Sequence, residues 1–180
     1  KQSISKLTLN IPSKWSRKRR DYARQAMRDN KPELAYFLAS NHFVSGGSDY
    51  ADLEWLSGYI SLRKLKNPSQ AISHFNNFLN EVKTPISLGR AGYWLGRAHE
   101  ENNELRLAKY YFRLGAQNQS SFYGQLSAEK IGAKLENSLV SFKTNKAISI
   151  EEFAKNDIFR LAIILYESNA DILSKRFFLH

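Results

Sequence analysis

Hydrophobic side chains recur every three or four residues along most of this 180-residue sequence. The clearest run lies between residues 68 and 82, and it comprises Ala71, Ile72, Phe75, Phe78, Leu79 and Val82. Because an α-helix completes a turn in about 3.6 residues, these side chains share one helix face. The pattern therefore predicts an amphipathic helix here, and the same spacing elsewhere predicts an all-α protein.

Capping residues and prolines indicate where the helices begin. Asn67-Pro68 and Thr84-Pro85 each combine a side chain that caps free N–H groups with a proline, whose missing N–H costs nothing in the first turn. The caps and the apolar spacing together predict helices over residues 13–28, 32–43, 49–65, 68–82, 85–98, 105–115 and 121–134, and a final pair within 156–180.

Two stretches lack the helical period. Residues 1–12 show no sustained spacing, and we expect an irregular N-terminal segment there. Residues 135–155 mix Asn, Ser and Thr with β-branched side chains, and we interpret them as a connector. The expected domains are therefore a helical-repeat domain over residues 13–134 and a final helix pair over residues 156–180, which is expected to lead into a further domain.

The stretch from Thr84 to Leu126 is typical of two helices packed as a hairpin, followed by the start of a third. Its first helix contains Gly89, Gly92 and Gly96, although a glycine in a helix costs up to about 1 kcal/mol relative to alanine. Glycines kept at that cost allow a neighbouring backbone to come close. The facing stripe of the second helix is expected to be Leu105, Ala108, Phe112 and Gly115.

An internal repeat favours one architecture. Ala35, Ala71 and Ala108 follow one another at intervals of 36 and 37 residues, and an aromatic residue stands four positions after the last two. Leu95-Gly96 precedes Ala108 with the spacing of tetratricopeptide repeats. We therefore expect stacked antiparallel helix pairs forming a tetratricopeptide-like superhelix. In that arrangement the core-packing aromatic residues are Trp55, Phe75, Tyr93, Trp94 and Phe112.

Longer motifs resemble a known family. PISLGRAGYWLGRAHEENNE, followed by AKYYFRLGAQ and SFYGQLSAEKIG, resembles the α-superhelical region of soluble lytic murein transglycosylases, which carries PISxARAxYWxGRAxE and then FYGQLA. The earlier YADLEWLSGYISLRKL resembles the family's YADAEWLAGWIALR-type helix. The resemblance extends from about Trp15 to the C-terminus and is strongest between Tyr50 and Gly132.

The resemblance implies a function in the cell wall. Enzymes of the family cleave peptidoglycan between N-acetylmuramic acid and N-acetylglucosamine and form a 1,6-anhydro end, using one glutamic acid in a separate lysozyme-like domain. That glutamic acid belongs to a Glu-Ser motif followed by a Gly-Leu-Met-Gln-type stretch. Here the only Glu-Ser pair is Glu167-Ser168, with 12 residues after it and no such stretch. We interpret Glu167 as a polar helix end and expect no catalytic residue in this chain.

The resemblance therefore implies a non-catalytic scaffold that supports a catalytic domain of the same polypeptide. Its implied partner is the peptidoglycan glycan strand, and its implied location is the periplasm. We expect the chain alone to be inactive as a lyase.

Charge is concentrated near the N-terminus. The net charge is +10, and residues 1–31 contain ten Lys or Arg against two Asp, which leaves +8 in that segment. The run from Trp15 to Arg20 makes Arg17, Lys18, Arg19 and Arg20 candidate contacts for an anionic polymer. A basic run beside an aromatic residue could instead grip nucleic acid, and a solvated helix face is the simplest interpretation.

Other chemistry has little support in the sequence. The absence of cysteine excludes disulfides and thiolate metal sites, and no apolar run approaches the ~20 residues of a membrane span. His42, His74 and His99 lie on separate predicted helices without a carboxylate at ligand spacing, so we expect no metal. The sequence contains neither a nucleophile elbow nor a glycine-rich phosphate loop, so we expect no cofactor.

Two interpretations stay open beside the scaffold. One is a free-standing tetratricopeptide-like module that binds a protein partner, and the other is a helical domain that binds nucleic acid through its basic run. The remaining charged residues of the central motif are interpreted as salt bridges between helices or contacts to a following domain: Arg90, Arg97, Glu100 and Arg106.

Overall fold

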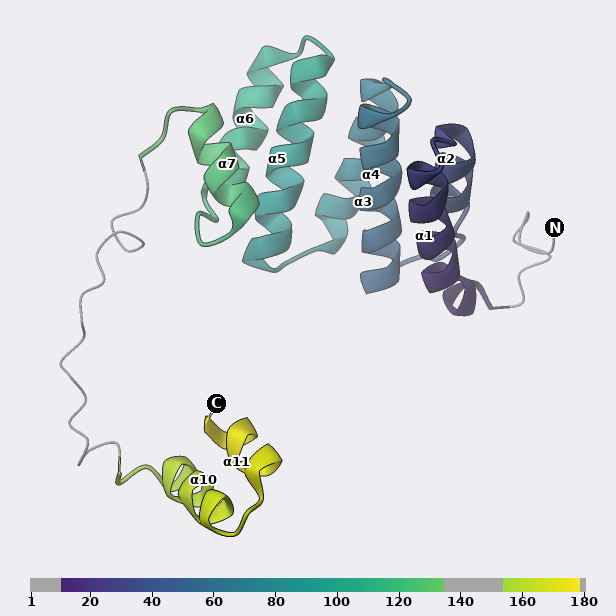
Figure 1. The fold of residues 1–180 in the computed structure, drawn as a ribbon. Helices are drawn as coiled ribbons and strands as arrows, with labels where there is room; N and C mark the ends of the chain where they lie inside the picture. The colour runs from purple at the N-terminus through teal and green to yellow at the C-terminus, as the bar shows by residue number, and fades with distance from the viewer. Residues whose placement is uncertain (1–10, 135–153, 179–180) are drawn as a thin grey trace. The chain divides into compact units, whose positions relative to one another are not determined.

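The structure is a computed structural model that describes residues 11–134 and 154–178. Within those ranges every regular element is an α-helix, which confirms the all-α prediction (Figure 1). The helices are α1 (Pro12–Arg28), α2 (Pro32–Ser40), α3 (Ser48–Arg63), α4 (Pro68–Glu81), α5 (Pro85–Glu101), α6 (Leu105–Ala116), α7 (Phe122–Lys130), α10 (Asp157–Glu167) and α11 (Asp171–Phe178). Contacts divide the chain into two units, one with α1 to α7 and one with α10 and α11.

The predicted helix starts are confirmed by their caps. The side chain of Asn67 accepts a hydrogen bond from the N–H of Gln70 at the start of α4, and Thr84 accepts from Ser87 at the start of α5. Asn156 caps α10 in the same way. Such caps are read from a few neighbouring residues, which explains why the sequence placed these starts within one or two positions.

Two helices end earlier than predicted. α2 stops at Ser40, not near residue 43, because Phe43 has a φ of 56°, in the left-handed region that a right-handed helix cannot use. α7 stops at Lys130, not at Lys134, and Gly132 follows with a φ of 65°. The predictions for residues 1–10 and for most of the 135–155 connector lie outside the described residues.

Neighbouring helices pack in antiparallel pairs, α1 with α2, α3 with α4 and α5 with α6, and α7 follows against both α5 and α6 (Figure 1). α1 also contacts α3, and α5 contacts α7. α3 contacts α5 through the ring of Trp55, which lies against the ring of Trp94. The odd-numbered helices are therefore neighbours in the order α1, α3, α5, α7.

The core lies between these pairs and repeats from one pair to the next. Ala35, Ala71 and Ala108 are all buried, as the repeat predicted. The buried ring of Phe75 on α4 covers Gly58 of α3, where a Cβ atom would lie 2.6 Å from the ring. Phe112 of α6 covers Gly96 of α5 in the same way, at 2.5 Å. A small residue on the first helix of a pair thus receives an aromatic ring from the second.

The predicted close approach within the α5–α6 hairpin is confirmed at Gly92. A Cβ atom there would lie 2.5 Å from the Cα atom of Gly115 on α6, closer than real carbon atoms pack. The two glycines let the backbones of α5 and α6 meet directly. This contact fixes the position of α5, whose other face carries the residues discussed below.

One residue that was predicted to pack between helices, Leu105, is exposed, and so are two aromatic residues of α1. Leu105 is 68% exposed because it is the first residue of α6 and lies beyond the end of α5, which would have to cover it. Trp15 and Tyr22 lie on α1, and no described helix packs over that side of it. Spacing alone places these residues on a helix but does not say where the neighbouring helix ends.

The second unit is a hairpin of α10 and α11. Its buried residues are Ala162 and Ser174, and the Ser174 hydroxyl donates to the carbonyl of Ala162 at 2.8 Å. Several apolar side chains of α10 are exposed, namely Ile158, Leu161 and Ile164. Two short helices bury only the seam between them, so this unit has a very small core.

Candidate functional site

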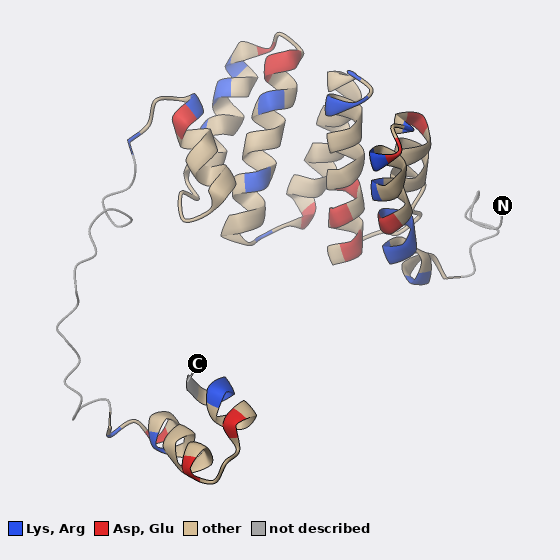
Figure 2. Cartoon of the chain, viewed as in Figure 1, with Lys and Arg blue, Asp and Glu red and all other residues tan. Residues whose placement is uncertain are grey.

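The basic run lies on α1, where Figure 2 colours Lys and Arg blue, and its side chains divide between surface and interior. Arg17 and Lys18 are exposed on α1. Arg19 is only 2% exposed, since its guanidinium donates to the carbonyl of Leu38 at 3.2 Å and burial lowers its pKa. Arg20 pairs with Asp52 of α3 at 2.5 Å.

The four candidate contacts therefore have different roles in the fold. Arg19 joins α1 to α2, and Arg20 joins α1 to α3. Only Arg17 and Lys18 present their charges freely to a polymer, so the proposed contact rests on these two. Periodicity could not separate them, because four consecutive residues point in four directions around a helix.

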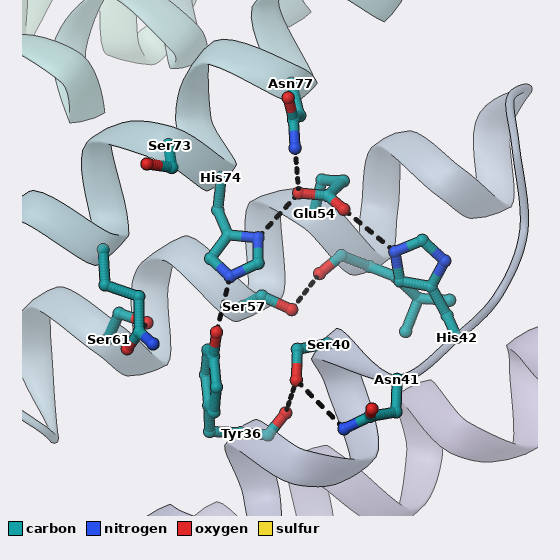
Figure 3. A network of polar contacts seen from close by, with 12 residues as sticks. Tyr36, Ser40, Asn41, His42, Glu54, Ser57, Ser61, Ser73, His74 and Asn77 are labelled. Carbon is teal, nitrogen blue, oxygen red and sulfur yellow. Dashed lines mark hydrogen bonds and ion pairs between the residues drawn. The ribbon is translucent and has the colours of Figure 1, made fainter. Parts of the chain in front are cut away.

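Two of the three histidines in the described residues meet at one buried carboxylate (Figure 3). Glu54 of α3 is 5% exposed and accepts hydrogen bonds from His42 Nε2 at 2.9 Å and His74 Nδ1 at 2.7 Å. The amide of Asn77 donates to the same carboxylate at 3.1 Å. Sequence spacing did not reveal this carboxylate, because it lies 12 residues from His42 and 20 residues from His74.

The network continues outward from both histidines. His42 Nδ1 accepts the N–H of Val44 at 3.1 Å, which leaves its proton on the Nε2 that faces Glu54. His74 Nε2 contacts the hydroxyl of Tyr36 at 2.8 Å. Together these bonds connect α2, the loop after it, α3 and α4.

The third histidine is also paired. His99 Nδ1 lies 2.6 Å from the carboxylate of Glu104 and its ring stacks on Tyr111 at 5.0 Å. The hydrogen bond from His99 lowers the pKa of Glu104. One signal for such pairs was visible in the sequence: Glu54 stands among the apolar positions of its helix, between Leu53 and Leu56, where a charge requires partners.

The chemistry of Glu54 does not suit proton donation. Burial alone would raise its pKa, but the hydrogen bonds from His42, His74 and Asn77 outweigh burial and lower it to about 2. A glycosidase acid needs the opposite shift, so that the carboxyl is protonated at working pH. Burial also raises the pKa of Tyr36, which keeps its hydroxyl protonated. The network of Tyr36, His74, Glu54 and His42 therefore stabilises the packing of the helices that it connects.

The only Glu-Ser pair in the sequence, Glu167-Ser168, lies at the end of a helix, as predicted. Glu167 is the last residue of α10 and is exposed, and the hydroxyl of Ser168 donates to the carbonyl of Ile164 at 2.7 Å. These are the features of a polar helix end.

A continuous set of aromatic rings crosses α3, α5 and α7. We call it the aromatic surface and define it by the partly exposed residues Trp55, Tyr59, Tyr93 and Tyr123. Trp94, which is almost buried, connects them: its ring centroid lies 5.2 Å from Tyr59 and 5.4 Å from Tyr93. Tyr93 in turn lies 5.4 Å from Tyr123 of α7. One side of this set packs on the core around Phe75 and Leu95.

Arg90 of α5 stands at the centre of the aromatic surface. Its guanidinium carbon lies 5.2 Å from the ring centroid of Trp55 and 5.8 Å from that of Tyr123. Its Nε atom is buried without a hydrogen-bond partner. Two turns later on the same helix, Arg97 pairs with Glu100 at 3.2 Å and Glu101 at 3.4 Å. Both Arg97 pairs lie within α5, so the expected salt bridge between helices is found for Glu100, which binds Lys130 of α7 at 2.9 Å, and not for Arg90.

This arrangement offers two kinds of contact to a ligand. Partly exposed rings present a negative π face that attracts the weakly positive C–H groups of a sugar ring or another aromatic ring. The guanidinium presents planar N–H donors and a positive charge. The sequence analysis assigned Trp55 and Tyr93 to the core. Spacing could not show their exposure, because aromatic residues on a helix have the same spacing in a core and at a ligand surface.

Comparisons with protein-family models, with curated proteins and with solved structures give no match for this chain. No helix within residues 11–134 and 154–178 is long and apolar enough to cross a lipid bilayer. The same ranges contain no group of three or more His, Cys, Asp or Glu side chains that could hold a metal ion.

Proposed function

We propose that this chain is the non-catalytic superhelical scaffold of a peptidoglycan lytic transglycosylase, and that its aromatic surface borders the glycan strand. One observation carries the proposal. The residues of the aromatic surface come from the three motifs that carry the family resemblance: Trp55 and Tyr59 from YADLEWLSGYISLRKL, Tyr93 from PISLGRAGYWLGRAHEE and Tyr123 from SFYGQL. Motifs far apart in the sequence thus supply neighbouring side chains on one surface.

The packing supports a tetratricopeptide-like superhelix as the architecture. The Gly58–Phe75 and Gly96–Phe112 contacts repeat the same small-to-aromatic fit in successive pairs. Such pairs cannot cover their apolar faces alone, so stacking supplies the core. An extended row of first helices is the surface on which repeat proteins of this kind bind their ligands.

The acidic residues support a scaffold without its own chemistry. Cleavage of a glycosidic bond requires a carboxyl that is protonated at working pH and lies against the leaving oxygen. Glu54 is held ionised by its three donors, and Glu167 is exposed at a helix end. We therefore assign the reaction to a catalytic domain of the same polypeptide, acting in the periplasm.

Intrinsic fluorescence tests the glycan contact directly, because Trp55 and Trp94 report on the aromatic surface. We expect chitotetraose, a neutral tetramer of N-acetylglucosamine, to change the emission in a saturable way. Tyr123→Ala should weaken binding roughly three- to tenfold, since one aromatic contact is worth about 0.5–1.5 kcal/mol. Tyr22→Ala removes an exposed tyrosine from α1 and should bind as the wild type does. Absence of binding by the wild type would refute the proposal.

A protein partner is the second candidate. An open pocket of about 690 Å³ lies at the start of α6, where Leu105, Leu107 and Tyr110 form an apolar part beside Asn103, Glu104 and Arg106. Exposed apolar patches of this kind are typical of protein interfaces. Two results together would favour this function over the first. The wild type would bind no glycan, and the Leu105→Glu variant would lose a protein partner that the wild type binds.

A further inference from the structure

The charge of Arg90 has no counter-charge among the residues that the structure describes. No hydrogen bond or ion pair involves this side chain among residues 11–134 and 154–178, and its described contacts are the two ring faces of Trp55 and Tyr123. The two rings come from different helices, α3 and α7. Contacts with two ring faces restrain the guanidinium, because the π faces attract its charge.

The neighbouring acids are already engaged. On α3, Asp52 pairs with Arg20 and Glu54 is bound by its two histidines. On α5, Glu100 and Glu101 pair with Arg97, and Glu100 also binds Lys130 of α7 at 2.9 Å. Asp49, the remaining acid of α3, accepts from Ser16. No acid of α3 or α5 is therefore left to pair with Arg90.

An oriented, partly buried and unpaired guanidinium is suited to an anion from outside the protein. A carboxylate matches its fork with two parallel N–H···O bonds, and such charge-assisted pairs are the stronger hydrogen bonds in proteins. The aromatic walls require in addition that the carboxylate be carried by a group that can lie against a ring. The ligand should thus combine a carboxylate with a sugar-like or other flat framework.

We propose that Arg90, between Trp55 and Tyr123, binds the lactyl carboxylate of an N-acetylmuramic acid residue whose peptide has been removed. This proposal rests on the glycan contact proposed above and names the group that the same surface recognises. Peptide-free muramic acid carries a carboxylate on a short ether arm beside a pyranose ring. The aromatic surface spans three helices, which suits a row of sugar rings better than a single acidic side chain.

The test compares three tetrasaccharides on the full 180-residue chain by tryptophan fluorescence. The first is the peptide-free alternating tetramer of N-acetylglucosamine and N-acetylmuramic acid, the second is the same tetramer with both carboxylates converted to methylamides, and the third is chitotetraose. We expect the wild type to bind the free acid about tenfold more tightly than the methylamide. This preference should fall as ionic strength rises.

The variants assign the preference to one residue. Arg90→Gln should reduce the ratio of the two affinities to about one and leave chitotetraose binding within about twofold, while Arg90→Lys should retain only part of the preference because it lacks the planar fork. Arg113→Gln removes an exposed arginine from α6 and should keep the full preference. Because each ratio is measured on one protein sample, partial unfolding of a variant does not change it.

The outcomes separate this proposal from the one on which it rests. Equal affinity of the wild type for acid and methylamide, or a preference that survives Arg90→Gln, would overturn the role of Arg90 while chitotetraose binding still supports the scaffold. Binding of none of the three glycans would overturn both. Displacement of bound glycan by an acidic peptide at much lower concentration, dependent on Arg90, would overturn the sugar ligand in favour of a peptide.

Discussion

Glu54 and Arg90 are the two partly or fully buried charges whose surroundings differ most. Glu54 has two imidazole donors and one amide donor, whereas Arg90 has two ring faces and no counter-charge in the part of the chain that the structure describes. Removing one partner of a buried, hydrogen-bonded charge is strongly destabilising, and a charge without a counter-charge is a candidate for ligand binding. We therefore expect substitution of Glu54 to change stability, and we propose the ligand-binding role for Arg90.

Replacing Glu54 should destabilise the first unit strongly. Glu54→Ala leaves the buried N–H groups of His42 and His74 without acceptors, and breaking a buried charged network of this kind costs about 3–5 kcal/mol. Glu129→Ala on α7 removes an exposed carboxylate and should change stability by less than about 0.5 kcal/mol. Urea unfolding followed by circular dichroism measures both. Equal midpoints for the two variants would show that the network contributes little.

The same carboxylate predicts a pH dependence. Its pKa falls from 4.5 to about 2 on folding, so the unfolded chain binds the proton first as the pH drops. The stabilisation, roughly 3 kcal/mol by linkage, is complete above pH 4.5 and is lost as the pH falls towards 2. The free energy of unfolding of the wild type should therefore fall more steeply over this range than that of Glu54→Gln. Parallel curves would contradict this assignment.

At the residue scale, the sequence predicted what depends on near neighbours. The caps Asn67, Thr84 and Asn156 were found because each acts on N–H groups two or three positions later. The partners of Glu54 were not found, because His42 and His74 lie 12 and 20 residues away on other elements. Nothing local to Arg19 distinguishes it from the exposed Lys18.

At the scale of elements, the hairpin of α5 and α6 depends on a backbone contact that only glycine allows. Gly92 and Gly115 were predicted to permit a close approach, and the structure places their backbones together. The unpredicted features are the early end of α2 and the exposure of Leu105. The first depends on the left-handed backbone of Phe43 and the second on where the neighbouring helix ends, and apolar spacing within one helix contains neither.

Gly92→Ala should destabilise the protein although alanine is the better helix former. The added Cβ would lie 2.5 Å from the Cα of Gly115, and overpacking of this kind costs about 1–3 kcal/mol or more, which exceeds the gain of at most about 1 kcal/mol from helix propensity. The matched control is Gly46→Ala, where the new Cβ would meet only the Glu81 side chain at 3.6 Å. Thermal unfolding should give a clearly lower midpoint for Gly92→Ala only. A raised midpoint would show that α5 and α6 have room between them.

At the scale of the whole molecule, the sequence predicted the helices and their pairing better than the surface that they form. Trp55, Tyr59 and Tyr123 have the spacing of core residues, and only their meeting across α3, α5 and α7 shows that part of each ring stays accessible. The net charge did not predict which charges are available at the surface either. Arg19 and Arg20 of the basic run bond to other helices of the fold. Surface chemistry needs the packing of several elements at once.

The central claim is that the chain binds the glycan of the cell wall without cleaving it, and co-sedimentation with purified peptidoglycan sacculi tests it most directly. The salt concentration should be high enough to screen the exposed Arg17 and Lys18. We expect the wild type to sediment with the sacculi and the supernatant to contain no 1,6-anhydro muropeptides above a blank. The double variant Trp55→Ala/Tyr123→Ala should stay in the supernatant, while the control Tyr22→Ala/Phe37→Ala, which alters exposed rings elsewhere, should sediment. Wild-type protein that stays in solution, or released anhydro products, would contradict the claim.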